Sequence, residues 1–264
     1  MTAFVLKLIA LATMIIDHID KILPITAYKS DSVIWQIYDV IILTGRVAFP
    51  IYAFLIAEGC KKTRSMPKYI FRLFMFMLIS EVFYIMAFYG GRNHGMALVE
   101  YALSHVAALK FRNIFATLMF GAVAVYACQL VSKLKLNIAV KTPIILSAVL
   151  FIMLIAEYFN SSYGFLAIGL IFLLYLSDDR IFQVIIIIVW CAVFYLLRTS
   201  FNGTRFMFLE NFIYWKWFAF ACLAVVPVML YNGERGKSIK WAFYIIYPLH
   251  LMLFTAVREL VYLL

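Results

Sequence analysis

A basic residue and a histidine share one face of the first apolar segment. Lys7 and His18 are eleven positions apart within KLIALATMIIDHID, residues 7–20. At about 100° per residue, eleven positions bring two helical side chains to within about 20° of each other in projection. Histidine has an ordinary pKa of about 6.5, so it can accept and return a proton near neutral pH. His18 is therefore our candidate for a general base.

Other ionisable or polar side chains also lie inside apolar segments, where a charge costs about 2.5–3.5 kcal/mol on insertion scales. Asp39 and Arg46 are seven positions apart, again about 20° in projection, so they either pair or face one cavity. Glu58 is an alternative structural partner for Arg46. In the last apolar segment, Tyr247 and His250 lie near the middle, where His250 either bridges helices or contacts a ligand.

These residues must be positioned by long apolar helices. The chain has 264 residues and is 66% hydrophobic, whereas soluble domains contain about 45–50% apolar residues. One span needs about 20 apolar residues, because the hydrocarbon layer is about 30 Å thick. We predict an all-α, polytopic helical bundle in one membrane domain, residues 1–264, with about nine transmembrane helices. The predicted spans are residues 4–24, 36–59, 68–89, 112–132, 142–158, 163–177, 181–198, 212–231 and 239–262.

Lysine and arginine in the loops predict the orientation, since cytoplasmic loops collect these residues. The stretch CKKTRSMPKYIFR, from Cys60 to Arg72, is the most basic part of the chain and is assigned to the cytoplasm. This choice places the N-terminus inside and the C-terminus outside. It also places two further basic groups inside: Lys133, Lys135 and Lys141, and Arg235, Lys237 and Lys240. Gly95–Phe111 is then expected to be an external or re-entrant helix.

Several features have structural interpretations. The net charge of +10 is explained by this loop topology, so no nucleic-acid partner is predicted. The four cysteines lack paired spacing such as CxxC and predict neither a disulfide framework nor a metal site. Glu81 and Glu157 are expected to be hydrogen-bond partners between helices. The expected location is a plasma or inner membrane, in contact with membrane lipid, and the oligomeric state is left open.

Several ordered blocks resemble the TraX-type membrane proteins. They are KLIALATMIIDHID at 7–20, GRVAFPIYAFLIAEG at 45–59, YIFRLFMFMLIS at 69–80, NIFATL at 113–118, YG at 163–164, LYNGERG at 230–236 and YIIYPLHLMLF at 244–254. The namesake of this family N-acetylates a pilin subunit. A weaker resemblance extends to transmembrane acyltransferases, whose first helix carries a basic residue, ten intervening residues and a histidine. Lys7 and His18 fit that spacing.

The resemblance implies a bacterial membrane acyltransferase that takes an acyl group, most plausibly acetyl, from cytoplasmic acyl-CoA. The acceptor would be an extracytoplasmic peptide N-terminus, lipid or glycan. His18 would be the base, Lys7 would meet the donor, and Arg46, Asn113 or Thr117 would stabilise the oxyanion. The donor phosphates would bind the basic stretch, together with Arg235 and Lys237, and Tyr247 and His250 would also be on the donor side. The basic residues of this stretch are Lys61, Lys62, Arg64, Lys68 and Arg72.

Two other function classes are consistent with the same residues. A secondary transporter or channel could use the buried His, Arg and Glu side chains as a substrate or proton path, although the sequence has no convincing internal repeat. A non-enzymatic assembly protein is the third class, but it leaves the shared face of Lys7 and His18 unexplained.

Overall fold

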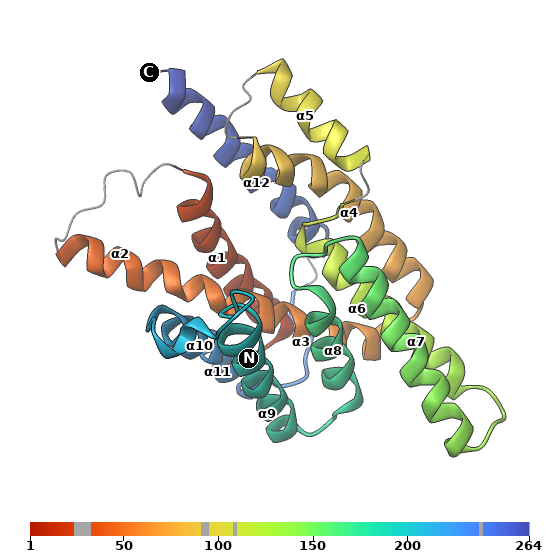
Figure 1. Cartoon of the computed structure of the whole chain (residues 1–264). Helices are drawn as coiled ribbons and strands as arrows, with labels where there is room; N and C mark the ends of the chain where they lie inside the picture. Colours follow the sequence, from red (N-terminus) through yellow and green to blue (C-terminus); the bar gives the residue numbers. More distant parts are fainter. Residues whose placement is uncertain (24–32, 91–94, 108–109, 238–239, 264) are drawn as a thin grey trace. The chain divides into compact units, whose positions relative to one another are not determined.

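The structure of the chain is a computed structural model that describes residues 1–23, 33–90, 95–107, 110–237 and 240–263. Within these ranges the chain is helical and contains no strand beyond one isolated bridge between Phe201 and Phe206. The all-α fold class is thus confirmed. Figure 1 labels the helices along the chain. The ends of two predicted spans, residues 24 and 239, lie outside the described ranges.

The helices follow the predicted spans closely. Their bounds are α1 Ala3–Ile22, α2 Val33–Leu43, α3 Ala48–Lys62, α4 Met66–Tyr89, α5 Met96–Ala107, α6 Ile114–Ser132, α7 Ile138–Tyr158, α8 Gly164–Leu176, α9 Arg180–Cys191, α10 Ile213–Cys222, α11 Val225–Met229 and α12 Lys240–Leu263. Short 3₁₀ segments cover Thr44–Val47 and Met207–Leu209, and a π-helix covers Ala192–Arg198. Each predicted span corresponds to one helix or to consecutive helices.

Six helical stretches in the described residues are long and apolar enough to cross a membrane: Val33–Lys62, Met66–Tyr89, Ile114–Ser132, Ile138–Tyr158, Arg180–Arg198 and Trp241–Tyr262. Gly164–Leu176 and Ile213–Met229 are apolar but shorter. Helix α1 has 20 residues but carries Lys7, Asp17, Asp20 and Lys21. The chain is therefore a multi-pass membrane protein by these helices, and the count of nine spans stays a prediction.

The segment from Gly95 to Phe111 forms one short helix, α5, whose described residues are Met96–Ala107. It packs against α4. With 12 residues, α5 would extend about 18 Å, which is shorter than the hydrocarbon layer. The helical part of this prediction is confirmed, and its external or re-entrant position stays a prediction.

Local sequence explains where several helices begin. The side chains of Asn113, Asn137 and Asp179 each accept a hydrogen bond from a backbone N–H in the first turn of α6, α7 and α9. Such N-caps satisfy donors that have no partner within the helix. Pro67 lies in the first turn of α4, where the missing proline N–H removes no helical hydrogen bond.

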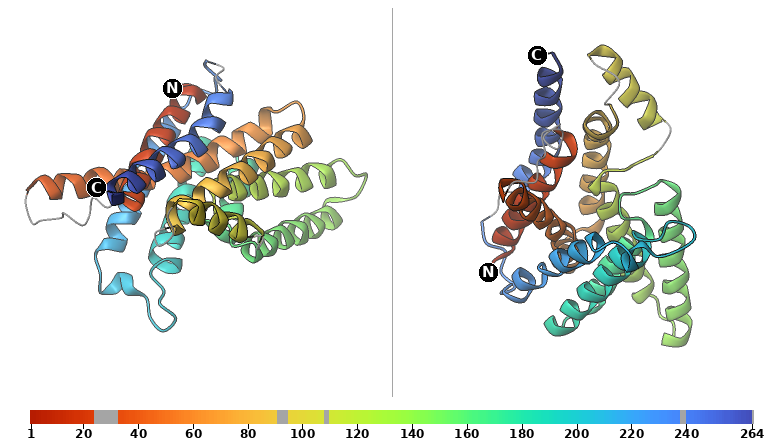
Figure 2. Two further views of the ribbon diagram at one scale, coloured as in Figure 1. Left: turned by 90° about the horizontal axis from the view of Figure 1, so that it is seen from above. Right: turned by 60° about the vertical axis from the view of Figure 1, so that its left-hand side comes forward.

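The chain divides into two compact units. Unit 1 comprises Met1–Tyr52 and Asp179–Leu264, and unit 2 comprises Ala53–Asp178. In unit 1, α1 packs against α12 and against the 3₁₀ segment Thr44–Val47, and α10 packs against the same segment and the π-helix. Figure 2 shows α1 and α12 side by side. In unit 2, α6 is the central helix and contacts α4, α7 and α8.

Interrupted helices are concentrated in unit 1. The 3₁₀ segment separates α2 from α3 within a stretch of 30 residues that is otherwise apolar helix. The π-helix continues α9, and the turn after Cys222 separates α10 from α11. Because 3₁₀ and π segments inside longer helices often mark functional sites, we expect a site in this part of unit 1.

Candidate functional site

His18 and His250 meet in the interior of unit 1. His18 is on α1 and His250 is on α12, and both side chains are buried. The Nδ1 atom of His18 lies 2.7 Å from the Nε2 atom of His250, a hydrogen-bond distance. Their rings are nearly parallel, with an angle of 11° and centroids 5.0 Å apart. The two histidines, 232 positions apart in sequence, therefore form a hydrogen-bonded pair.

The hydrogen bond between His250 and the backbone of Ile246 shows which ring nitrogens of the two histidines carry protons. The Nδ1 atom of His250 lies 3.0 Å from the carbonyl oxygen of Ile246. A carbonyl oxygen only accepts, so Nδ1 of His250 donates and, in the neutral ring, Nε2 carries no proton. Nδ1 of His18 must then donate to that Nε2. In the neutral pair, Nε2 of His18 is consequently the nitrogen with a basic lone pair.

Tyr247 lies beside both histidines. Its ring centroid is 6.1 Å from that of His18 and 5.4 Å from that of His250, in edge-on arrangements, and its side chain is buried. The three aromatic side chains restrict one another's orientation. Tyr247 and His250, predicted on the donor side, thus lie with the predicted base.

Asp17, the residue before His18 in sequence, belongs to a group of three charges. Asp17 forms an ion pair with Lys21 one turn further along α1, and its Oδ1 atom lies 3.6 Å from the Nη1 atom of Arg46. The Asp17 side chain is 13% exposed and the Arg46 side chain 23%. The guanidinium of Arg46 also stacks over Trp217 of α10, with 5.0 Å to the ring centroid.

Arg46 has a charged partner that was not among the alternatives predicted from the sequence. Among the described residues its charged partner is Asp17, rather than Asp39 or Glu58. Projection angles assume one continuous α-helix, but the 3₁₀ segment that contains Arg46 begins after Asp39. Gly45 makes the close approach feasible, because a Cβ atom at this position would overlap Asp17.

One guanidinium nitrogen of Arg46 has no hydrogen bond from this arrangement. The Nε atom is shielded from solvent, and no described residue accepts a hydrogen bond from it. The 3.6 Å separation from Asp17 is an ionic contact longer than an ordinary hydrogen bond. Arg46 therefore has donor capacity beyond its contacts with the protein.

Lys7 lies at the other end of the polar face of α1. Its ammonium is 5.6 Å from the ring centroid of Phe243, and it is close enough to Arg235 for the two positive charges to repel. Backbone pairing fixes this proximity, since Phe4 N–H donates to the carbonyl oxygen of Arg235 at 3.2 Å. The LYNGERG loop, residues 230–236, thereby brings a second cation to Lys7, which makes this region suited to an anion.

Asn113 belongs to unit 2 and has a different setting. Its Nδ2 group donates to the carbonyl oxygen of Met77 and to the carboxylate of Glu81, while its Oδ1 atom caps α6. Glu81 is fully buried and also accepts the backbone N–H groups of Arg112 and Asn113 at 2.8 and 3.1 Å. These contacts give Asn113 a structural role, and its predicted role at an oxyanion stays untested.

The interhelical roles predicted for Glu81 and Glu157 are confirmed. Glu81 joins α4 to the start of α6. Glu157 of α7 accepts the backbone N–H of Phe165 in α8 at 3.1 Å.

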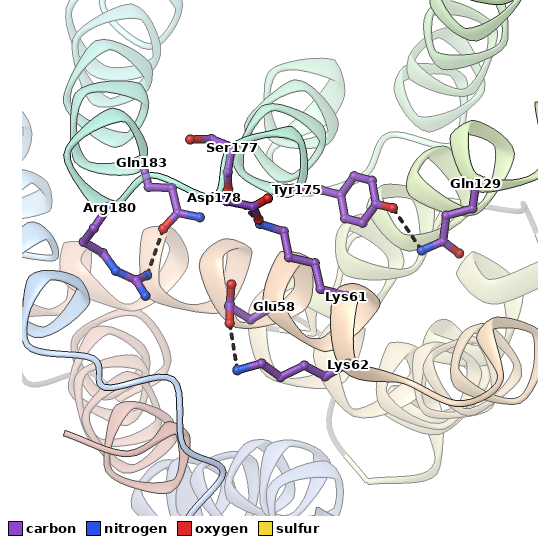
Figure 3. A network of polar contacts seen from close by, with 9 residues as sticks. All are labelled: Glu58, Lys61, Lys62, Gln129, Tyr175, Ser177, Asp178, Arg180 and Gln183. Carbon is purple, nitrogen blue, oxygen red and sulfur yellow. Dashed lines mark hydrogen bonds and ion pairs between the residues drawn. The ribbon is translucent and has the colours of Figure 1, made fainter. Parts of the chain in front are cut away.

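The five basic residues of the basic stretch differ in their partners: two of them form ion pairs with carboxylates. Lys61 donates to the carbonyl oxygen of Ser177 and pairs with Asp178, each at 2.7 Å, and Lys62 pairs with Glu58 at 3.0 Å (Figure 3). The Lys61 ammonium lowers the pKa of the exposed Asp178 carboxyl. Lys61 and Lys62 therefore already have anionic partners within unit 2.

The remaining three basic residues lie at the start of α4. Arg64 and Lys68 are exposed, and Arg72 stacks on Tyr69 with 5.7 Å to the ring centroid. Pro67, Lys68, Phe71 and Arg72 line an open surface cavity of about 550 Å³. These three basic residues are therefore available to an external anion.

Sequence reasoning missed Asp17, Trp217 and the pairing of His18 with His250. Asp17 lies about 80° from Lys7 in projection, so the helical spacing does not place it on the face shared by Lys7 and His18. Its signal was its position next to His18 and four residues before Lys21. Nothing in the sequence specifies that Arg46 stacks on Trp217.

Comparison with known proteins agrees with the blocks quoted above. The family model described as TraX protein matches residues 3–258. The chain is 22% identical over 278 aligned residues to a protein of Dichelobacter nodosus described as probable fimbrial assembly protein FimC, serogroup H1, covering 97% of this chain and 96% of the relative. No solved structure matches. Because the family model covers nearly the whole chain, this protein belongs to the TraX family.

Proposed function

We propose that this protein is a membrane-embedded acyltransferase that transfers an acyl group, most simply acetyl, from acyl-CoA to an extracytoplasmic acceptor. In this proposal nine spans cross the inner membrane of a bacterium and the N-terminus is cytoplasmic. The observation that carries the proposal is the His18–His250 pair, whose hydrogen bonds leave a basic nitrogen on a buried histidine.

The chemistry assigned to His18 is general base and then general acid catalysis. Nε2 of His18 removes a proton as the acceptor's amine or hydroxyl attacks the thioester carbonyl carbon. The tetrahedral intermediate then collapses, the C–S bond breaks, and the departing CoA sulfur takes the proton from His18. His250 acts as a positioning residue, because it holds His18 in the required tautomer through the Nδ1–Nε2 hydrogen bond.

Arg46 is the assigned stabiliser of the oxyanion. Its charge is permanent, its Nε atom has no acceptor among the described residues, and its ring and carboxylate neighbours fix its orientation. Asp17 offsets the charge of the guanidinium at rest without hydrogen-bonding to Nε. An oxyanion placed at this nitrogen would receive a charge-assisted hydrogen bond in a shielded environment.

The donor's phosphates are assigned first to Lys7 and Arg235, because these two cations lie in the same unit as His18. Lys7 and His18 are eleven positions apart, about 16 Å along the helix axis, a distance for the pantetheine arm to cross. Tyr247 would contact the acyl end of that arm. The basic stretch from Lys61 to Arg72 remains a second candidate for the phosphates.

The relative from Dichelobacter nodosus supports a choice of acceptor. Its description concerns fimbrial assembly, and the resemblance that we noted implies N-acetylation of a pilin subunit. We therefore propose the N-terminal amine of a processed pilin-like peptide as the first acceptor to test, ahead of a lipid or glycan.

The experiment is acetyl-CoA turnover by purified protein, followed by thiol release and by acetylation of an acceptor peptide. His18→Ala is expected to lower the turnover number by about 10²–10⁴-fold. His250→Ala should lower it less and shift its pH profile, because the tautomer of His18 is no longer fixed. His105→Ala is the matched control, since His105 lies on α5 in unit 2, and it should leave turnover unchanged.

Two results would oppose this assignment. One is a wild-type protein that neither binds acetyl-CoA nor releases thiol; the other is equal turnover in His18→Ala and wild type. A secondary transporter is the alternative, favoured by the interrupted helices of unit 1. It predicts substrate flux into sealed vesicles that needs no acyl donor, so a flux measurement without acyl-CoA separates the two functions.

A further inference from the structure

The first turns of α4 form a surface that combines two cations with apolar side chains. Lys68 and Arg72 are four residues apart, and Phe71 lies three residues after Lys68, so the three side chains are neighbours on one helical face. With Pro67 they line the open cavity of about 550 Å³. The lining of the cavity is therefore mainly apolar and includes two cationic residues.

Arg72 is oriented by its own helix and still has hydrogen-bonding capacity. Its guanidinium stacks on Tyr69, three residues earlier, while its Nε atom is shielded from solvent and has no hydrogen-bond acceptor among the described residues. A shielded guanidinium nitrogen without an acceptor is costly unless a ligand or water supplies one. An external anion would supply such an acceptor.

Apolar side chains continue from the cavity along the same helix. Phe71 is 61% exposed, and Phe74, Met75 and Ile79 are also exposed on the following turns. Helix α4 is one of the six stretches long and apolar enough to cross a membrane. The exposed apolar side chains would thus meet acyl chains, while Lys68 and Arg72, near the start of the helix, lie at headgroup depth.

We propose that the cavity at Pro67, Lys68, Phe71 and Arg72 binds the phosphate of an anionic phospholipid, whose acyl chains lie along Phe71, Phe74 and Met75. A soluble phosphate compound would use the two cations but not the exposed apolar side chains. Anionic phospholipids satisfy both. This binding site does not depend on acyl transfer, and it holds on whichever side of the membrane α4 begins.

The partners of the neighbouring lysines support this choice of residues. Lys61 and Lys62 have carboxylate partners at 2.7 and 3.0 Å, so these two charges are already compensated. No described residue of the chain forms a salt bridge with Lys68 or Arg72. The lipid site is therefore confined to the start of α4 and does not include the whole basic stretch.

The test is lipid binding to purified protein in an uncharged detergent, measured by native mass spectrometry with added phosphatidylglycerol or phosphatidylcholine. Wild type should bind phosphatidylglycerol preferentially. Lys68→Ala/Arg72→Ala should weaken that binding by about 30-fold and leave the binding of phosphatidylcholine unchanged. Lys68→Arg/Arg72→Lys keeps both charges and should restore most of the preference.

The matched control removes two charges elsewhere in unit 2. Lys133 and Lys135 are exposed in the turn between α6 and α7, and Lys133→Ala/Lys135→Ala should leave the preference for phosphatidylglycerol intact. An equal loss in this control would overturn the proposal, because binding would then follow net charge alone. An unchanged lipid preference in Lys68→Ala/Arg72→Ala, with or without weaker acyl-CoA binding, would also overturn it.

Discussion

Each unit of the protein has a carboxylate with little exposure to solvent, Glu81 at 0% and Asp17 at 13%, and the two have different kinds of partner. Glu81 in unit 2 accepts three hydrogen bonds from Arg112 and Asn113, two of them from backbone N–H groups at the start of α6. Asp17 in unit 1 is instead surrounded by the cationic side chains of Lys21 and Arg46. Backbone partners are fixed by the fold, whereas side-chain partners can reorient towards a ligand.

The surrounding helices differ in the same way. Unit 2 contains the long continuous helices α4, α6 and α7, whereas unit 1 contains the 3₁₀ segment, the π-helix and the break between α10 and α11. A carboxylate that caps a helix stabilises a continuous element. A carboxylate beside an interrupted helix can serve a site. We therefore assign Glu81 to stability and Asp17 to function, and the following changes test that assignment.

The largest effect on stability is expected for Glu81→Ala. It leaves two backbone N–H groups and the amide of Asn113 without their acceptor in the interior, and each such buried donor costs about 1–3 kcal/mol. We expect a loss of about 3 kcal/mol or more in the free energy of unfolding, measured by denaturation in detergent. Glu81→Gln keeps an acceptor oxygen and should lose less.

Acyl transfer provides the opposing readout for Glu81. If Glu81→Gln folded normally but lost transfer as completely as His18→Ala, unit 2 would contain part of the chemical site. The distinction between the two carboxylates would then be wrong.

Asp17→Ala is expected to have the next largest effect. The free energy of unfolding should fall by about 2 kcal/mol, because two partly buried cations lose their anion. In a double-mutant cycle, Asp17→Ala and Arg46→Ala should show a coupling energy of about 1 kcal/mol or more. Turnover of acyl-CoA should fall in both single variants. Additive effects on stability would mean that the 3.6 Å contact does not couple the two charges.

Much of the fold could be predicted from the sequence, because apolar runs of the length of a membrane locate helices directly. The residues of α4, α6 and α7 agree with the predicted spans to within a few positions. The predictions were less complete where charges or breaks interrupt an apolar run. Helix α1 carries four charged residues. The 3₁₀ segment lies inside a predicted span shortly before Pro50, which lacks the backbone N–H for a helical hydrogen bond and so signals an interruption, but its exact position and 3₁₀ geometry could not be predicted.

The site was predictable only in part, for a related reason. His18, Arg46 and His250 stood out because ionisable groups are costly in an apolar environment. Their partners depend on which helices pack together, and periodicity along one helix does not contain that information. Asn113 illustrates the converse, since a polar residue at the end of a span became a cap for α6 through contacts with Met77 and Glu81.

Alanine substitutions at Gly45 and Gly169 are expected to have smaller effects on stability, and the two effects should differ. Gly45→Ala places a Cβ atom against the backbone and Cβ of Asp17, which cannot move aside easily, so we expect a loss of about 1–2 kcal/mol in stability. Gly169→Ala in α8 would meet only the terminal methyl of Met153 at 3.1 Å, and higher helix propensity favours alanine there. Thermal unfolding of both variants measures the difference. Equal melting temperatures would show that α1 and the 3₁₀ segment are not tightly packed.

The smallest effect is expected for Lys62→Ala. In its ion pair with Glu58, the lysine side chain is 50% exposed and the glutamate side chain 14%, so the change in stability should be about 1 kcal/mol or less. The Michaelis constant for acyl-CoA should also change little if Lys7 and Arg235 hold the phosphates. A several-fold increase would favour the basic stretch as the donor site, and Lys133→Ala controls for the loss of one surface charge.

The 3₁₀ segment Thr44–Val47 also changes the rotational register of the long helical stretch from Val33 to Lys62. A 3₁₀ helix turns by about 120° per residue, compared with about 100° in an α-helix, and rises about 0.5 Å more. Over four residues the side chains that follow are rotated by about 80° and displaced by about 2 Å. Positions before and after the segment therefore follow two separate helical wheels. A one-residue insertion here would be accommodated if the 3₁₀ turn became α-helical, because five α-helical residues turn and rise about as much as four 3₁₀ residues. The same insertion in α6 would rotate one half of a continuous, packed helix by about 100° relative to the other half.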